Sequence, residues 1–267
     1  MKNRLVEKIA QAGKSKEKLF CAFLTLGYPS LAVTEKLILG FEKAGVDIIE
    51  LGFPFSDPLA DGPTIQYSSE QALKRGIGMA DAYRLVAKLR RNGCGVPIVF
   101  FSYINPILSQ GLKAFVAKAK VRGFDGLIIP DLPPEEEPEL EKISRRYDMP
   151  VMRLAAPTTD SRRAALIAKK SRGFVYFVSL RGVTGARSAV PADIHKILKA
   201  LKRSSRIPVL IGFGVSNPEQ AKKLAAMSQG VIVGSAIINR LRSSGGRTEP
   251  VIRYVRKMVK AVKSVSQ

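Results

Sequence analysis

Eight short apolar runs alternate with longer segments of helical periodicity along this chain, and no other feature restricts its fold as strongly. Each run is bounded by Gly, Pro or Asp and is continuously apolar more than strictly alternating. That pattern is typical of parallel strands that are buried on both faces. The runs span residues 19–26, 46–52, 97–103, 126–130, 150–155, 174–179, 208–212 and 230–235.

The segments between the runs carry helix signals. Asn217 can cap a helix, and Pro218 suits the first helical position after it. Residues 240–263 combine apolar positions at helical spacing with eight basic residues against one acid. We expect this stretch to be an outer helix that packs on the sheet; a membrane-surface or nucleic-acid helix is the alternative.

Eight strand–helix units in 267 residues, without a linker between them, predict an α/β protein with a single (β/α)8 TIM barrel. We expect one domain over residues 1–267, with an extra N-terminal helix that plugs or flanks the lower end of the barrel. The alternative is an open doubly wound sheet. That fold also calls for a Gly-rich dinucleotide fingerprint after its first strand, and residues 25–30, TLGYPS, do not form one.

The second run brings three carboxylates, Glu50, Asp57 and Asp61, to one strand end and the loop that follows it. Because side chains alternate along a strand, we expect Glu50 to point into the barrel mouth, where such barrels carry their chemistry. Burial there should raise its pKa, as a proton donor near neutral pH requires. The alternative is a Glu that caps a loop through hydrogen bonds. Asp61 should lie closer to water, which suits separate acid and base roles.

Glycine-rich turns after three of the later runs predict a phosphate site. Gly182 and Gly185 follow the sixth run, Gly212 and Gly214 surround the end of the seventh, and Gly234 stands in the eighth. Glycine lets the backbone approach an anion, and N–H groups at a helix N-terminus bind one. Loops after the seventh and eighth strands of such barrels often hold phosphate.

Several protein classes are excluded or disfavoured by composition. No apolar run approaches the roughly 18 residues of a membrane span, and the N-terminal segment lacks an apolar signal-peptide core, so we expect a cytoplasmic protein. Cys21 and Cys94 form no CxxC pair, and His195 is the only histidine, which excludes a site built on two histidines. The net charge of +22 is spread over many predicted helices, as on a solvated surface.

The motifs also carry a family resemblance. In order, the chain contains AFLTLGYPS from Ala22, ELGFPFSDPLADGPTIQ from Glu50, SYINPI from Ser102, GLIIPDLPPEE from Gly126, APTT from Ala156, VSLRGVTGAR from Val178, IGFGVS from Ile211 and VGSAII from Val233. Over nearly its whole length the chain resembles the alpha chain of tryptophan synthase. The resemblance implies a lyase of L-tryptophan biosynthesis that cleaves indole-3-glycerol phosphate to indole and glyceraldehyde 3-phosphate by a retro-aldol reaction.

The resemblance also implies roles for individual residues. Glu50 would be the acid–base group that protonates indole carbon 3, and Asp61 would accept a hydrogen bond from the indole N–H. Substrate-binding roles fall on Phe23, Phe101, Tyr103, Tyr176 and Thr184, and phosphate-binding roles fall on Gly185, Phe213, Gly214, Gly234 and Ser235. Ordinary barrel core is the alternative for the phenylalanines and Tyr103. Arg181 could reach the phosphate or point to solvent.

A partner is implied as well. Family members bind a beta chain that carries pyridoxal phosphate, in a tetramer of two alpha and two beta chains, and indole passes directly between the two sites. Pro54 and Asp57 lie in the loop that would face this partner, and no metal or organic cofactor is implied for this chain. Two other functions stay open: a stand-alone lyase that releases indole, and a basic barrel that binds nucleic acid or an anionic membrane.

Overall fold

The computed structural model describes residues 2–136, 138–178, 197–201, 203, 207–212 and 214–265. Eight parallel strands close into a barrel in which each strand pairs with the next and β1 pairs with β8. The strands are β1 (Leu19–Thr25), β2 (Ile48–Gly52), β3 (Ile98–Phe101), β4 (Gly126–Ile128), β5 (Val151–Ala155), β6 (Val175–Val178), β7 (Val209–Gly212) and β8 (Gly230–Val233).

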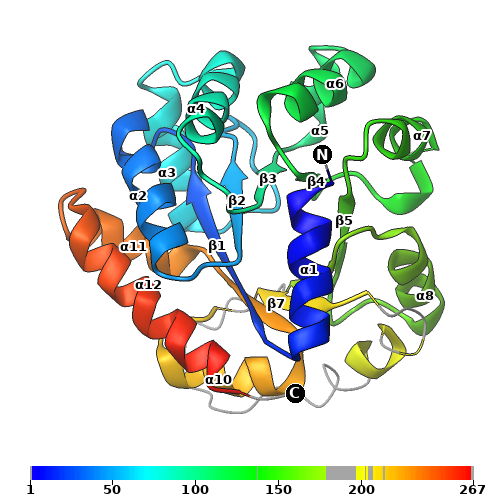
Figure 1. The fold of residues 1–267 in the computed structure, drawn as a ribbon. Coiled ribbons are helices and arrows are strands. Elements are labelled where there is room, and N and C mark those ends of the chain that lie inside the picture. The colour runs from blue at the N-terminus through cyan, green and yellow to red at the C-terminus, as the bar shows by residue number, and fades with distance from the viewer. Residues whose placement is uncertain are drawn as a thin grey trace.

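Helices surround the strands, as Figure 1 shows. The described helices are α1 (Arg4–Ser15), α2 (Leu31–Lys43), α3 (Pro63–Leu73), α4 (Met79–Arg91), α5 (Ile104–Leu108), α6 (Leu112–Arg122), α7 (Pro138–Arg146), α8 (Ser161–Lys170), α10 (Pro218–Met227), α11 (Ser235–Ser243) and α12 (Thr248–Lys263), with the short 3-10 helix η1 (Pro134–Glu136) before α7. The predicted α/β class and (β/α)8 barrel are confirmed, and the open sheet is wrong.

Each predicted apolar run contains one strand, and every strand is shorter than its run. The run at 97–103 holds a strand only over Ile98–Phe101, and the run at 230–235 holds one over Gly230–Val233. Pro97 cannot donate a ladder hydrogen bond, and Ser235 already begins α11. The apolar runs therefore predict where the strands lie, whereas backbone hydrogen bonding determines at which residue each strand begins and ends.

The register places chemistry-bearing side chains inside the barrel. Glu50 is paired with Phe23 on β1 and with Val99 on β3, and all five residues of β2 are buried. Residues paired in a parallel register share a face of the sheet, so Phe23 and Glu50 project to the same side. The strand ends that carry them form the C-terminal face of the barrel.

The opposite, N-terminal face is covered by α1, which lies in front of the strands in Figure 1. The Asn3 side chain caps this helix by accepting hydrogen bonds from the N–H groups of Leu5 and Val6. The same side chain donates to the backbone carbonyls of Asp125 and Asp148, which precede β4 and β5. Leu5 is fully buried. The predicted extra helix at the lower end is thus present.

The basic C-terminal stretch forms the outer helix α12, as expected. Its apolar positions are buried against the barrel side, and it packs against α2 and α10. Asn217 and Pro218 begin α10, and the Asn217 side chain accepts a hydrogen bond from the Gln220 N–H. None of the helices within the described residues has the length and apolar character of a membrane-spanning segment.

Candidate active site

Glu50 lies near the end of β2, inside the barrel. Its side chain is 0% exposed, and within the described residues neither carboxylate oxygen has a hydrogen-bond partner. Burial raises the pKa of Glu50 to about 8; the thiol of the neighbouring Cys21, a weak donor that does not reach hydrogen-bond geometry with Glu50, lowers it only in part. The loop-capping alternative finds no support there, because a cap requires hydrogen bonds. Glu50 therefore holds its proton at neutral pH and is positioned to give it up.

Asp61 occupies the loop between β2 and α3 and is half-buried. The Tyr103 hydroxyl donates a hydrogen bond to Asp61 Oδ2 at 3.1 Å and accepts one from the Ala60 N–H at 2.9 Å. Burial raises the pKa of Asp61 to about 6, and the bond from Tyr103 lowers it in part. Asp61 is more exposed than Glu50 and ionises at lower pH, so the two carboxylates differ as two separate roles require.

Aromatic rings line the barrel mouth around Glu50. Phe23 and Phe101 meet edge to face with ring centroids 5.6 Å apart. Tyr176 lies on β6, opposite β2 in the strand order. Burial, and then the Glu50 charge, raise the pKa of Tyr176 well above its ordinary value, which places its phenol within electrostatic reach of Glu50. Rings of this kind suit a flat aromatic ligand.

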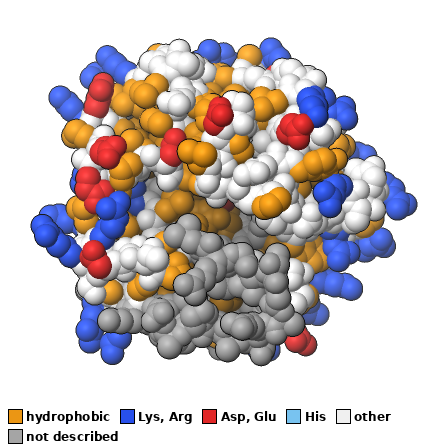
Figure 2. Space-filling model, turned by 180° about the vertical axis from the view of Figure 1, so that it is seen from behind, with side chains coloured by type: hydrophobic (Ala, Val, Ile, Leu, Met, Phe, Trp, Pro, Cys, Tyr) orange, Lys and Arg blue, Asp and Glu red, His pale blue; other side chains and the backbone are white. Residues whose placement is uncertain are grey.

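Two glycines at strand ends leave room for these rings. A Cβ atom on Gly52 would lie 2.4 Å from the Phe23 ring, and one on Gly212 would lie 2.4 Å from the Tyr176 ring. Any larger residue would displace the rings, so both glycines shape the mouth. Figure 2 shows the face opposite α1, where the surface is hollowed and hydrophobic side chains lie deep in the hollow.

Part of the predicted phosphate site is described. Gly214 follows β7, and Gly234 is the N-cap of α11 after β8, with Ser235 as the first helical residue. Because β7 and β8 are paired, these two turns adjoin at the C-terminal face. Backbone N–H groups in a first helical turn lack partners within the helix and can bind an anion. Thr184, Gly185, Phe213 and Arg181 lie outside the described residues.

The loop predicted to face a partner divides into a buried and an exposed part. Pro54 is buried, whereas Asp57 is exposed and accepts a hydrogen bond from the Ser56 hydroxyl at 2.5 Å. Leu59, two residues further on, is 92% exposed. An apolar side chain presented to this extent beside the mouth is a feature that the sequence interpretation missed.

Metal ligands are not gathered at this site in the part of the chain that the structure describes, where no group of three or more His, Cys, Asp or Glu side chains could hold an ion. Cys21 and Cys94 are buried and unbridged. His195 lies outside the described residues.

A barrel that keeps an unpaired carboxyl group buried among aromatic rings at the carboxyl ends of its strands belongs to the (β/α)8-barrel enzymes. Comparison with known proteins narrows this class. The family model for the tryptophan synthase alpha chain matches residues 9–267, and the chain belongs to that family.

Individual relatives agree with this assignment. The tryptophan synthase alpha chain of Geobacter sulfurreducens is 45% identical over 236 residues, which cover 88% of this chain and 89% of the relative. That of a Thermoanaerobacter species is 41% identical and covers 98% of this chain and 99% of its own. The crystal structure of tryptophan synthase subunit alpha from Legionella pneumophila superposes with a TM-score of 0.90 at 30% identity, over 99% of this chain and 100% of that one. The predicted family is confirmed, and the nucleic-acid or membrane scaffold and the stand-alone lyase gain no support.

Some contributions were not visible in the sequence. Tyr103 was predicted only as a wall of the indole site, yet its hydroxyl also holds Asp61, 42 positions away along the chain. The sequence indicates no role for Cys21, yet its thiol lies beside Glu50. The sequence offered one signal for Gly52, because a glycine in a strand often marks a place that another group approaches closely.

Proposed function

We propose that the barrel mouth cleaves indole-3-glycerol phosphate to indole and glyceraldehyde 3-phosphate by a retro-aldol reaction, as the alpha subunit of a tryptophan synthase. The observation that carries this proposal is Glu50, a fully buried carboxyl group without a hydrogen-bond partner among the described residues and with a pKa of about 8. Such a group is protonated at neutral pH and can act as a general acid.

Glu50 would serve in both halves of the cleavage. Its carboxyl group donates a proton to carbon 3 of the indole ring. The bond between carbon 3 and the carbinol carbon then breaks, and its electron pair returns to the ring. The hydroxyl proton of the carbinol carbon passes to the Glu50 carboxylate as the aldehyde forms. Glu50 ends the cycle protonated, so no further reactant is needed.

Asp61 would stabilise the intermediate between these steps. Protonation of carbon 3 makes the ring nitrogen cationic, and an anion held beside it lowers the energy of that state. With a pKa of about 6, Asp61 is mostly ionised at pH 7, and Tyr103 keeps its carboxylate in place. Phe23, Phe101 and Tyr176 would enclose the indole ring and the carbon chain.

The turns after β7 and β8 would hold the substrate phosphate. Gly214 has φ of 47°, a backbone conformation that favours glycine, and Gly234 and Ser235 begin α11 beside it. On the family pattern we assign Gly185 and Phe213 to the same phosphate end of the substrate, and Thr184 to the substrate-binding residues.

A tryptophan synthase beta chain would be the partner, in a tetramer of two chains of each kind. Pyridoxal phosphate would belong to that partner, and this chain would need no cofactor of its own. The exposed Asp57 and Leu59 leave the loop after β2 accessible for such a contact. We expect Pro54, which is buried, to shape the loop more than to touch the partner. A cytoplasmic location stays a prediction.

The test is an assay of indole-3-glycerol phosphate cleavage with and without a beta chain. We expect slow indole release by the isolated chain and strong activation when the beta chain is added. High turnover without activation would support the stand-alone lyase. No cleavage under either condition would reject the proposed reaction.

A further inference from the structure

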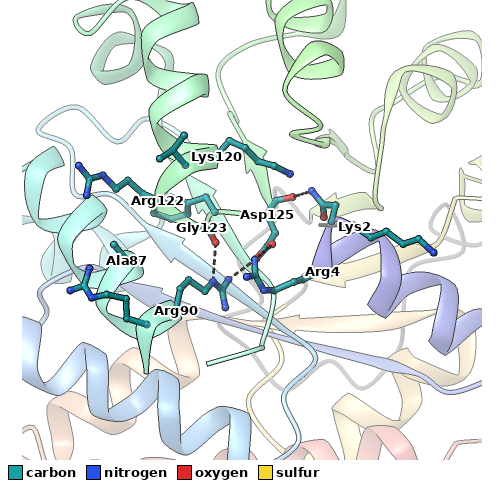
Figure 3. Close-up of a pocket in the computed structure, with 12 residues that line it drawn as sticks. Lys2, Arg4, Ala87, Arg90, Lys120, Arg122, Gly123 and Asp125 are labelled. Carbon is teal, nitrogen blue, oxygen red and sulfur yellow. Dashed lines mark hydrogen bonds and ion pairs between the residues drawn. The ribbon is translucent and has the colours of Figure 1, made fainter. Parts of the chain in front are cut away.

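A pocket of about 370 Å³ opens at the N-terminal face of the barrel, at the end opposite Glu50. It lies where the start of α1 meets the ends of α4 and α6. Its lining includes six basic side chains, from Lys2, Arg4, Arg90, Arg91, Lys120 and Arg122. Figure 3 shows Arg4 and Arg90 directed toward one acid, Asp125.

The described contacts leave part of this positive charge unbalanced. Asp125 binds Arg90 at 2.6 Å and Arg4 at 3.1 Å, and Lys120 donates to the backbone carbonyl of Asp148 and lies 3.6 Å from its carboxylate. Lys2, Arg91 and Arg122 are exposed and form no hydrogen bond or ion pair with any described residue. Three cations of this pocket thus have no described counter-charge.

Helix dipoles explain only part of the excess positive charge in this pocket. Arg91 ends α4 and Arg122 ends α6, so both side chains complement the negative ends of their helices. Each helix end is equivalent to about half a negative charge, and the pair therefore offsets about one of the surplus cations. Positive charge concentrated in a concave site attracts anions more strongly than the same charge spread over a surface.

We propose that this pocket binds a small anion that carries two or more phosphate groups. A phosphate group carries about −1.5 to −2 charges near pH 7, so two of them carry at least the charge of the unpaired Lys2, Arg91 and Arg122. Guanidinium groups bind phosphate oxygens with two parallel hydrogen bonds. The volume lies at the lower end of the roughly 300–1,000 Å³ of ligand pockets, which suits a compact ligand. Because the pocket lies across the barrel from the mouth, it is separate from the phosphate turns proposed above.

The test compares two double charge reversals in the full-length chain. R91E/R122E changes the pocket, and K169E/K260E makes the same change of net charge in the last turns of α8 and α12, where both lysines are exposed. Arg4 and Arg90 are left intact, because they hold Asp125. Pyrophosphate, ATP and AMP are titrated calorimetrically into each protein, and circular dichroism verifies that both variants are folded.

We expect wild type and K169E/K260E to bind pyrophosphate alike and R91E/R122E to bind it about 100-fold more weakly. Binding of ATP with the affinity of pyrophosphate would identify the polyphosphate group as the ligand, and tighter ATP binding would identify a nucleotide; AMP should bind more weakly than either. Hydrogen exchange should slow on adding pyrophosphate at residues 86–93 and 119–126. The proposal is overturned if wild type binds no pyrophosphate, if both double variants lose binding equally, or if protection is confined to residues 211–216 and 233–238.

Discussion

A carboxyl group is buried near each of the two ends of the barrel, and the two groups differ in their hydrogen-bond partners. At the N-terminal face, Asp125 accepts hydrogen bonds from Arg4, Arg90 and the Ile98 N–H at 3.1, 2.6 and 2.9 Å. At the C-terminal face, Glu50 is equally hidden from water but accepts no hydrogen bond from a described residue. Burial alone therefore does not decide what a carboxyl group does; its partners do.

The difference between Asp125 and Glu50 shows how one fold can use a buried carboxyl group either for stability or for reactivity. A buried carboxylate that is paired with cations ties segments of the chain together, and removing one partner of such a pair is destabilising. A buried carboxyl group without partners lowers the stability of the folded chain when it ionises, so it retains its proton and stays reactive. This agrees with the general placement of chemistry at the C-terminal face of such barrels and of structural contacts at the other.

The largest effect should come from Glu50→Gln, which keeps the shape and removes the transferable proton. We expect kcat for indole-3-glycerol phosphate cleavage, with the beta chain present, to fall by about 10³-fold or more. Glu70→Gln on α3, an exposed glutamate with only a surface ion pair to Lys74, is the matched control and should leave kcat unchanged. Turnover of Glu50→Gln near the wild-type value would show that the unpaired acid is not the proton donor.

The same variant should change how stability depends on pH. The pKa of Glu50 is raised from 4.5 to about 8, so between these values the unfolded chain releases a proton that the folded chain keeps. The free energy of unfolding of wild type should therefore fall relative to Glu50→Gln as the pH rises from 4.5 to 8, by on the order of 5 kcal/mol. Denaturant unfolding of both proteins at pH 5 and pH 9 measures this; parallel curves would contradict the raised pKa.

Asp125→Asn should show the reverse behaviour at the other end. Loss of the charge leaves Arg4 and Arg90 without their acid, and breaking a buried pair of this kind costs roughly 3 kcal/mol. We expect a clearly lower melting temperature but nearly normal kcat at a temperature where the variant is folded. Asp57→Asn, at an exposed carboxylate, is the control for stability. If Asp125→Asn has normal stability but no turnover, the N-terminal face cannot be purely structural and the proposed difference between the two faces is wrong.

The pH profile of kcat/KM should report the two carboxylates of the mouth. With Asp61 needed as an anion and Glu50 as an acid, the rate should rise through about pH 6 and fall above about pH 8. Asp61→Asn should lower kcat about 100-fold and remove the acidic limb. An unchanged acidic limb in this variant would assign that limb to another group.

Tyr103→Phe should have the smallest effect, because it removes one hydrogen bond and no reacting group. We expect kcat to fall roughly 2- to 10-fold, which corresponds to about 0.5–1.5 kcal/mol. The Tyr103 bond lowers the pKa of Asp61, so its loss should move the acidic limb of the profile to higher pH. Phe55→Leu removes the ring stacked on Tyr103 and keeps the hydroxyl; it should leave the limb in place. If the acidic limb of the pH profile does not move in Tyr103→Phe, Tyr103 contributes only packing and does not set the pKa of Asp61.

Local patterns in the sequence were enough to locate the strands and the buried Glu50. Every apolar run contains a strand. The alternation of side chains along residues 46–52 predicted that Glu50 is buried inside the barrel, because neighbouring side chains of a strand point to opposite faces whatever the strand packs against. The N-cap at Asn217 followed from the chemistry of one side chain. That residues 1–267 form one domain, and the catalytic and binding roles of the site residues, stay predictions.

The sequence by itself determined which residues are apolar, which strands they form and where carboxylates and glycines occur along the chain. Only the tertiary structure decided that Tyr103 reaches Asp61, that Tyr176 faces Glu50 across the barrel, and that Asp125 is paired while Glu50 is not. Those relations join residues far apart in the chain. They arise when the strands close into a barrel, since burial and partners, which set each pKa, exist only once distant segments have packed together.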